Sequence, residues 1–201
     1  MKKTKEEAEI TRKLIIEKAV ELFKLKGFAS TTLEEIAQQT KVTRGAIYWH
    51  FKDKLDIVNE LIEKEHKRLS ELLKELFGQN LPPFTKLENI IAEIIKNFYR
   101  KKSFQNFIDL TWFKIEYTQL SKLKTTKAEL NAYFMENLKI LIYEAQKIGN
   151  IKTNLSAQDI ALTLTTMING IYRLFFILPD QINNQKEAKK LFDTYLSLIK
   201  T

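Results

Sequence analysis

The sequence has no cysteine among its 201 residues, and only five glycines, three prolines and two histidines. Without thiols the chain forms no disulfide framework and no thiolate metal site, and two isolated histidines do not make a metal-binding set. No alternating strand pattern is present, whereas apolar residues recur with the 3.6-residue period of a helix along the whole chain. The sequence therefore predicts an all-α protein, and we expect neither a metal nor a cofactor.

The sequence also lacks a secretory segment at its start, and we expect no apolar run long enough to cross a bilayer. The formal net charge of +8 suits an anionic partner. Residues 1–54 hold 12 Lys and Arg against 8 Asp and Glu, so the positive excess is spread along the chain. Charge alone is therefore weak evidence for DNA binding. These features favour a cytoplasmic protein with no membrane partner.

The most informative stretch is residues 32–54, which combine two short helical patterns, a tight turn between them and the start of a third helix. Thr32 and Glu35 match the capping box that opens a helix. Thr43 is a second N-cap, and another helical pattern follows it at once. This arrangement is typical of a helix-turn-helix, whose second helix enters the major groove of DNA.

The second short helix has an unusual outer face. Ile47 and Phe51 lie four residues apart and share its inward face. The other side chains of this helix are then expected to point outward: Arg44, Gly45, Tyr48, Trp49 and His50. Arginine suits guanine edges, tyrosine and histidine reach phosphate oxygens or base edges, and small residues let a backbone approach closely.

We expect the DNA contacts to surround this helix. The predicted base-reading positions are Arg44, Gly45, Ala46 and Tyr48, and the predicted backbone contacts are Thr43, Trp49, His50 and Lys54. Lys54 falls in the first turn of the third helix, where a cation and free N–H groups suit a phosphate. Thr31 and Thr32 offer hydroxyls near a helix N-terminus, and capping requires only one of them.

The segment V-T-R-G-A-I-Y-W-H-F-K-D-K, from Val42 to Lys54, resembles the signature of the TetR family of bacterial transcriptional regulators. The opening K-T-K-E-E-A-E-I-T-R-K-L-I-I and the tail G-I-Y-R-L-F-F-I-L-P are similar to the acriflavine-resistance branch, which represses multidrug efflux pumps. One position differs, because the family usually has glycine before Val42 and this chain has Lys41. Either Lys41 adopts a positive φ with some strain, or the turn differs.

The resemblance implies about nine helices in two domains: a helix-turn-helix DNA-binding domain at residues 1–53 and a larger ligand-binding and dimerisation domain at residues 54–201. It also implies a homodimer in which the last two helices of each subunit form a four-helix bundle. The predicted dimer residues are Ile168, Ile171, Phe175, Leu191, Phe192, Tyr195, Leu196 and Ile199. The alternative is that both helices serve only the core of one subunit. A symmetric dimer prefers a palindromic operator in double-stranded DNA.

Residues 104–120 are predicted to form a helix that is apolar on nearly all sides and therefore buried. Aromatic rings beside a carboxylate suit a flat, lipophilic, cationic ligand. The predicted ligand-binding residues are His66, Phe98, Phe107, Thr111, Trp112, Glu116, Tyr133, Met167 and Tyr172. The alternatives are that the aromatics only fill the core and that His66 lies on the surface or caps a helix.

The sequence thus predicts a ligand-responsive repressor of a multidrug efflux or neighbouring transporter operon, released from its operator by a small-molecule inducer. The long helix that begins at Lys54 is expected to transmit the signal. A DNA-binding regulator that answers no small molecule is the alternative. We do not expect an enzyme, because the chain has no glycine-rich phosphate loop, no metal-ligand spacing and no nucleophile–base set.

Overall fold

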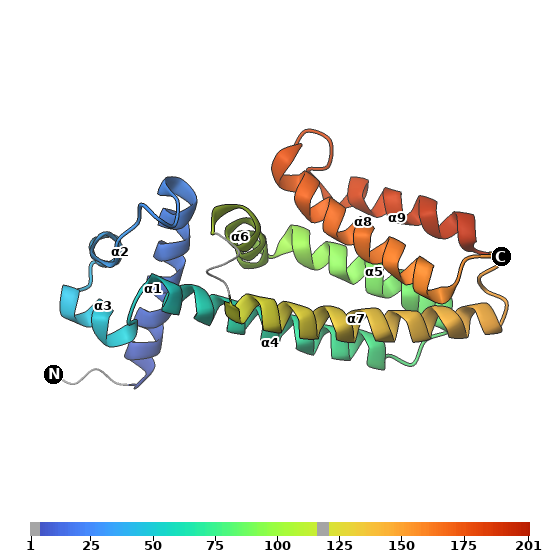
Figure 1. Ribbon diagram of the computed structural model, residues 1–201, viewed down its shortest axis with the longest axis horizontal. Helices are drawn as coiled ribbons and strands as arrows, with labels where there is room; N and C mark the ends of the chain where they lie inside the picture. The colour runs from blue at the N-terminus through green and yellow to red at the C-terminus, as the bar shows by residue number, and fades with distance from the viewer. Residues whose placement is uncertain (1–4, 116–120) are drawn as a thin grey trace. The chain divides into compact units, whose positions relative to one another are not determined.

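The computed structural model describes residues 5–115 and 121–201. Its regular elements in these ranges are helices, apart from an isolated β-bridge between Ile151 and Lys200, so the predicted all-α class is confirmed. The nine α-helices and one π-helix are α1 (Lys5–Lys26), α2 (Leu33–Thr40), α3 (Arg44–His50), α4 (Lys54–Gly78), α5 (Pro83–Arg100), α6 (Lys102–Asp109), η1 (Leu110–Lys114), α7 (Ser121–Lys147), α8 (Ala157–Ile177) and α9 (Gln185–Ile199) (Figure 1).

The chain folds into two compact units, and it enters each of them twice. Unit 1 comprises the residues up to His66 together with the segment that begins at Asn106. Unit 2 comprises residues 67–105 together with the residues from Lys127 onward. Three helices, α4, α6 and α7, therefore contribute residues to both units.

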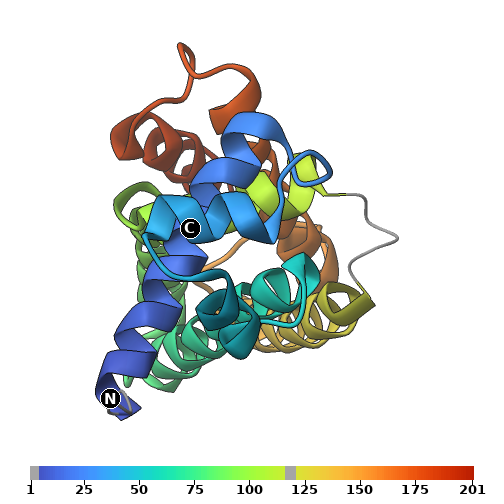
Figure 2. The same ribbon diagram turned by 90° about the vertical axis from the view of Figure 1, so that its left-hand side faces the viewer.

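Unit 1 is built around the apolar side of α1. Ile15, Ala19 and Phe23 on α1 are fully buried, as are Ile36 on α2 and Ile47 on α3. Each fully buried aliphatic or aromatic side chain contributes about 1.5–3 kcal/mol to folding. Figures 1 and 2 show α2 and α3 as two short helices beside the longer α1, which holds them in place.

One arginine ties three helices of unit 1 together. Arg12 on α1 forms an ion pair with Glu60 on α4, and its Nη1 donates to the backbone oxygen of His50 on α3 at 2.6 Å. Its guanidinium also lies 4.3 Å from the ring centroid of Phe51. Because charge, hydrogen bond and cation–π contact converge on one side chain, α3 is fixed at its C-terminal end.

The predicted helix over residues 104–120 is wrong. Helix α6 ends at Asp109, the π-helix η1 follows, and Ile115 has extended backbone angles while its N–H donates to the oxygen of Leu110 at 3.2 Å. Within unit 1, η1 packs against α1, and Lys24 of α1 donates to Asn106 at 3.0 Å and lies 3.6 Å from Asp109. The change from α-helix to π-helix therefore coincides with tertiary contacts to α1.

Unit 2 is organised around α5. Leu87, Ile90 and Phe98 of this helix are fully buried, and α5 packs along α9. Rings from neighbouring helices gather around Phe98 and form an aromatic cluster, whose members are Phe98, Tyr99, Phe104, Tyr172, Phe175 and Phe176. Aromatic rings in edge and stacked contacts at these spacings add to the stability that burial provides.

Helix α8 corrects the expectation that no apolar run is long enough to cross a bilayer. It has 21 residues, and among the described helices it alone reaches a mean hydropathy of 1.5 over an 18-residue window. A third of that window is buried inside the protein. Length and composition alone do not distinguish a membrane span from a core helix with a second apolar side.

Candidate DNA-binding site

The turn between α2 and α3 has the geometry that the sequence predicts at both ends. Thr32 caps α2, with its Oγ1 accepting from the N–H of Glu35 at 3.2 Å, and Glu35 accepts in return from the Thr32 N–H at 3.1 Å. Lys41 ends α2 with φ 55° and ψ 32°. Of the two alternatives for this position, the left-handed lysine is therefore the correct one.

Helix α3 begins at the predicted cap and shows most of the predicted outer face. Thr43 Oγ1 accepts from the N–H of Ala46 at 3.1 Å. Ile47 and Phe51 are buried, as predicted, while Tyr48 is 46% exposed and Trp49 is 73% exposed. Arg44 and Gly45 are exposed as well. The first turn and the aromatic side of α3 are thus open to a large ligand.

His50 does not point outward, so this prediction is wrong. The residue is only 7% exposed, and its ring contacts those of Trp49 and Phe51 at 4.6 and 6.4 Å between centroids. Because His50 follows Ile47 by three residues, helical geometry places both on the same side of α3. The i+3 spacing was therefore the signal in the sequence that this side chain is buried.

Thr31 is also misplaced by the sequence prediction. It is 1% exposed, and its hydroxyl donates to the backbone oxygen of Gly27 at 2.8 Å, so it is not free to meet a phosphate. Thr32, the cap of α2, is exposed. Only Thr32 of this pair remains a candidate for contact with DNA.

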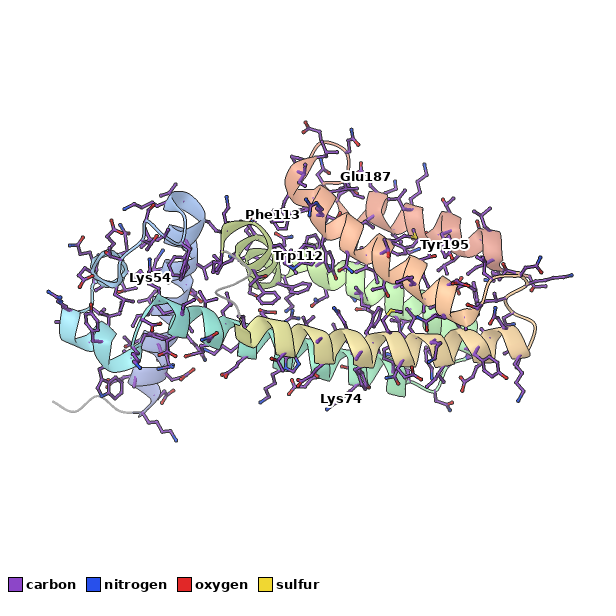
Figure 3. All side chains as sticks on the ribbon, viewed as in Figure 1. Lys54, Lys74, Trp112, Phe113, Glu187 and Tyr195 are labelled. Atoms are coloured by element: carbon purple, nitrogen blue, oxygen red, sulfur yellow. The ribbon has the colours of Figure 1, made fainter. Side chains whose placement is uncertain are left out.

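Lys54 lies in the first turn of α4, as predicted, and Figure 3 labels it there. Asp53 caps this helix by accepting from the N–H of Asp56 at 2.8 Å. The Lys54 ammonium donates to the backbone oxygens of Phe28 at 2.7 Å and Ala29 at 3.1 Å. An ammonium has three donors, so a phosphate contact at Lys54 would use the third.

Glu34 on α2 is a residue of this surface that the sequence reasoning missed. Its Oε1 accepts from the hydroxyl of Tyr48 at 3.0 Å and lies 3.2 Å from Nη2 of Arg44. A backbone hydrogen bond at Glu34 itself, the Tyr48 hydroxyl and the Arg44 charge together lower the pKa of Glu34, so the carboxylate is ionised at neutral pH. Nothing in the spacing along the chain signals this contact, because it joins two different helices.

The predicted ligand-binding residues fall into several groups. In unit 2, Phe98 and Tyr172 stack at 4.4 Å between centroids inside the aromatic cluster, whereas Tyr133 of α7 contacts the ring of Phe77 at 6.2 Å. Met167 lies elsewhere, in a groove between α8 and α9. Burial raises the pKa of Tyr172, which keeps its hydroxyl neutral.

The remaining predicted ligand residues belong to unit 1, or lie outside the described residues in the case of Glu116. Phe107 and Thr111 are buried, and the Thr111 hydroxyl donates to the Phe107 oxygen at 2.7 Å. His66 and Trp112 are half-buried, and Figure 3 labels Trp112 on η1. The described residues therefore bring together Phe98 with Tyr172 and Phe107 with Thr111.

The α8–α9 groove has a volume of about 370 Å³. It is lined by Met167, Gly170, Ile171, Leu174, Leu191, Thr194, Tyr195 and Leu198. Three of the predicted dimer residues, Ile171, Leu191 and Tyr195, are among them. The prediction missed Leu174 and Leu198, which are 39% and 75% exposed.

Four of the other predicted dimer residues belong to the interior of one protomer, and this is a correction. Phe192, Leu196 and Ile199 are 1–4% exposed and Ile168 is 7% exposed, so they have little surface left for a second subunit. Phe175 contacts Phe98 at 5.0 Å within the aromatic cluster. The inner and outer apolar sides of α9 are interleaved along the chain, so apolarity alone did not separate them.

Two short helices joined by a tight turn, with an open arginine, tyrosine and tryptophan on the second, define a helix-turn-helix DNA-binding protein. Residues 15–61 match the model of bacterial regulatory proteins of the tetR family, and residues 82–201 match the C-terminal region of MAATS-type transcriptional repressors. The chain belongs to the TetR family, as the sequence indicated, and it is a MAATS-type transcriptional repressor related to repressors of multidrug efflux pumps.

Curated relatives match along almost the whole chain. The transcriptional regulator TtgR of Pseudomonas putida is 26% identical over 202 residues, which cover 100% of this chain and 96% of the relative. AcrR of Shigella flexneri is 27% identical over 191 residues, which cover 94% and 88%. The similarity to the acriflavine-resistance branch is therefore confirmed.

Solved structures support the same fold. NalD of Pseudomonas aeruginosa, described as the secondary repressor of the MexAB-OprM multidrug efflux pump, has a TM-score of 0.79 at 23% identity, with 96% of this chain and 98% of NalD covered. The SmeT–triclosan complex, whose repressor comes from Stenotrophomonas maltophilia, has a TM-score of 0.76 at 19% identity, with 96% and 92% covered. At these identities the likeness establishes the fold.

Proposed function

We propose that this repressor binds, as a homodimer, a palindromic operator of a multidrug efflux or neighbouring transporter operon and leaves it when a lipophilic small molecule binds. The DNA-binding role is assigned to residues 1–53, and ligand binding and dimerisation to residues 54–201. The protein acts in the cytoplasm without a cofactor or a membrane partner. The open face of α3, with its exposed Tyr48 and Trp49, is the observation that carries the proposal.

The first turn of α3 supports close contact with DNA. Gly45 stands inside a helix, where glycine costs about 1 kcal/mol relative to alanine. A Cβ at this position would meet no described atom within 4 Å, so packing within the protein does not require glycine. An approaching base edge or phosphate would require it. Arg44, Ala46 and Tyr48 read bases in this proposal, and Thr32, Thr43, Trp49 and Lys54 contact the backbone.

The α8–α9 groove supports a homodimer. Leu174, Leu191 and Leu198 expose apolar surface along two neighbouring helices, which is unfavourable in water and typical of a subunit interface. Two grooves related by a two-fold axis would form a four-helix bundle and bury these leucines. The two α3 helices of such a dimer would then meet two half-sites of a palindrome.

The aromatic cluster of unit 2 supports a lipophilic ligand, and the charged side chains beside the cluster indicate which kind of ligand. The Arg68 guanidinium lies 5.3 Å from the ring centroid of Phe104 and donates to Asn97 at 2.7 Å. A cation is therefore already on this side of the cluster. Burial and, second to it, the Glu187 charge raise the pKa of Tyr99 to about 12, so its hydroxyl is a neutral donor to the Ile182 oxygen at 2.8 Å. A neutral or anionic lipophilic compound suits these groups better than a cation does.

Two connections support transmission of the signal. Helix α4 runs without a break from Lys54 to Gly78, and the α6–η1 segment contacts α1 through Lys24 and Asp109. An inducer shifts the equilibrium only by binding a conformer with low DNA affinity better than the DNA-bound one. Movement of α4 or of the α6–η1 segment would then change the position of the helix-turn-helix.

The test is fluorescence anisotropy on the duplex upstream of the protein's own gene, against a random duplex of equal length, at several salt concentrations. We expect tight, selective binding that triclosan weakens more than a lipophilic, non-intercalating cationic dye does. The variant Tyr48→Ala should lose operator binding while keeping its thermal stability. Tight binding that no lipophilic compound weakens would refute the inducer part of the proposal and leave a regulator without a small-molecule ligand.

A further inference from the structure

One carboxylate oxygen holds two of the side chains assigned to base reading. Glu34 Oε1 accepts from the Tyr48 hydroxyl at 3.0 Å and lies 3.2 Å from Arg44 Nη2. The Arg44 guanidinium is also 5.8 Å from the ring centroid of Tyr48. The three side chains are partly open to solvent, and Glu34 keeps 42% of its side-chain surface and Arg44 75%. This cluster therefore lies on the surface of α2 and α3 and not in the core.

A carboxylate is an unusual group for a DNA-facing surface. It repels phosphates, and on the base edges of the major groove its partners are amino groups such as that of cytosine. An arginine held by a carboxylate is also less available to a phosphate, because the phosphate must compete with a partner that is already in place. A guanine edge also offers arginine two acceptors, and it carries no negative charge for the carboxylate to repel.

We propose that Glu34 is a specificity-determining residue that positions Arg44 and Tyr48 and withholds the Arg44 charge from non-specific phosphates. On random DNA the Glu34–Arg44 pair persists and the carboxylate repels the backbone. On the operator Arg44 exchanges the carboxylate for a base edge, while Tyr48 stays oriented. This inference rests on the proposed role of α3 as the base-reading helix.

The variants Glu34→Gln and Glu34→Ala separate charge from position. Glutamine keeps an oxygen that accepts from Tyr48 and Arg44 but removes the negative charge, whereas alanine removes both. Glu21→Gln is the matched control, because Glu21 pairs with Lys18 at 2.7 Å on the exposed side of α1 and the same charge is removed. Thermal melts of the three variants establish that each is folded.

Dissociation constants are measured for the upstream duplex and for a random duplex between about 50 and 300 mM salt. For Glu34→Gln we expect random-duplex affinity to rise about tenfold, the salt slope to steepen by about one as Arg44 gains a phosphate, and the ratio of specific to random affinity to fall. Glu34→Ala should show the same gain on random DNA. It should also bind the operator more weakly than Glu34→Gln does, because alanine no longer positions Tyr48 and Arg44. Glu21→Gln should leave the ratio unchanged.

The inference is overturned if Glu34→Gln matches Glu21→Gln, or if it strengthens binding to both duplexes by the same factor. The single variant Tyr48→Ala distinguishes a failure of this inference from a failure of the proposed function. If Tyr48→Ala weakens operator binding and Glu34→Gln changes nothing, only the role of Glu34 is lost. If Tyr48→Ala leaves operator binding intact, α3 is not the reader and both proposals fail.

Discussion

Replacing Lys41 by glycine should stabilise the folded protein. Lys41 has φ 55°, the one positive φ at a non-glycine residue in the described part of the chain. Its N–H donates to the backbone oxygens of Ala37 and Gln38 at the end of α2, and glycine would keep this donor. The left-handed conformation costs a residue with a Cβ about 1–2 kcal/mol. Glycine avoids this cost but loses more backbone entropy on folding, about 0.5–1 kcal/mol.

The difference leaves a net gain of about 0.5–1 kcal/mol in the free energy of unfolding. For a chain of this length that corresponds to a melting temperature about 2 °C higher. The assay is thermal and urea unfolding followed by circular dichroism at one fixed protein concentration. Lys41→Ala is the essential control, because it removes the charge and the side chain while keeping the Cβ, and we expect it within about 0.5 kcal/mol of the wild type.

Gly149 provides a second control of opposite sign. It has φ 80° just after α7, and a Cβ there would meet no described atom within 4 Å, so Gly149→Ala tests backbone strain without a steric clash. We expect it to lower stability by about 1 kcal/mol. If Lys41→Gly is no more stable than Lys41→Ala, the strain argument fails at this turn.

Three further predictions concern other surfaces. Gly45→Ala should raise the melting temperature slightly, since alanine favours α3 by about 1 kcal/mol, and weaken operator binding measured by anisotropy; unchanged affinity would mean that DNA does not approach this turn. Leu198→Glu should raise the dimer dissociation constant at least about 100-fold in sedimentation equilibrium, because the Leu198 of each subunit loses about 1.5–3 kcal/mol of burial energy. Leu25→Glu on α1 is the control and should leave the dissociation constant unchanged. Burial by itself would raise the pKa of Glu60, but hydrogen bonds from Arg12 and Lys64 outweigh it and lower the pKa below 4.5. Stability should therefore fall as pH drops below about 4.5 and through the lower folded-state value, and Glu60→Gln should flatten this dependence in acid unfolding.

Local chemistry explains why the helix-turn-helix was predictable. The caps at Thr32 and Thr43 are hydrogen bonds to residues three positions away, so both partners of each bond lie in one short stretch of sequence. The left-handed turn at Lys41 is likewise set within a few residues. Such features depend little on the rest of the fold, which is why these elements begin where the sequence indicates.

The errors arise where distant segments meet. The burial of His50 is an exception, because its i+3 spacing from Ile47 signals it locally. The Glu34 carboxylate reaches Arg44 and Tyr48 from another helix. At the end of α6, Asp109 contacts Lys24 of α1, which is distant in the sequence.

The groove between α8 and α9 also affects how the stability of this protein is measured. The Tyr195 hydroxyl, on α9 in Figure 3, is buried and has no hydrogen-bond partner among the described residues of a single protomer. Leaving such a group unpaired costs about 1–3 kcal/mol, and exposed leucines beside it add to the cost. The proposed dimer would bury these leucines, so the folded protomer would gain stability by mass action. The melting temperature would then rise with protein concentration, and the protein would be least stable when it is scarce.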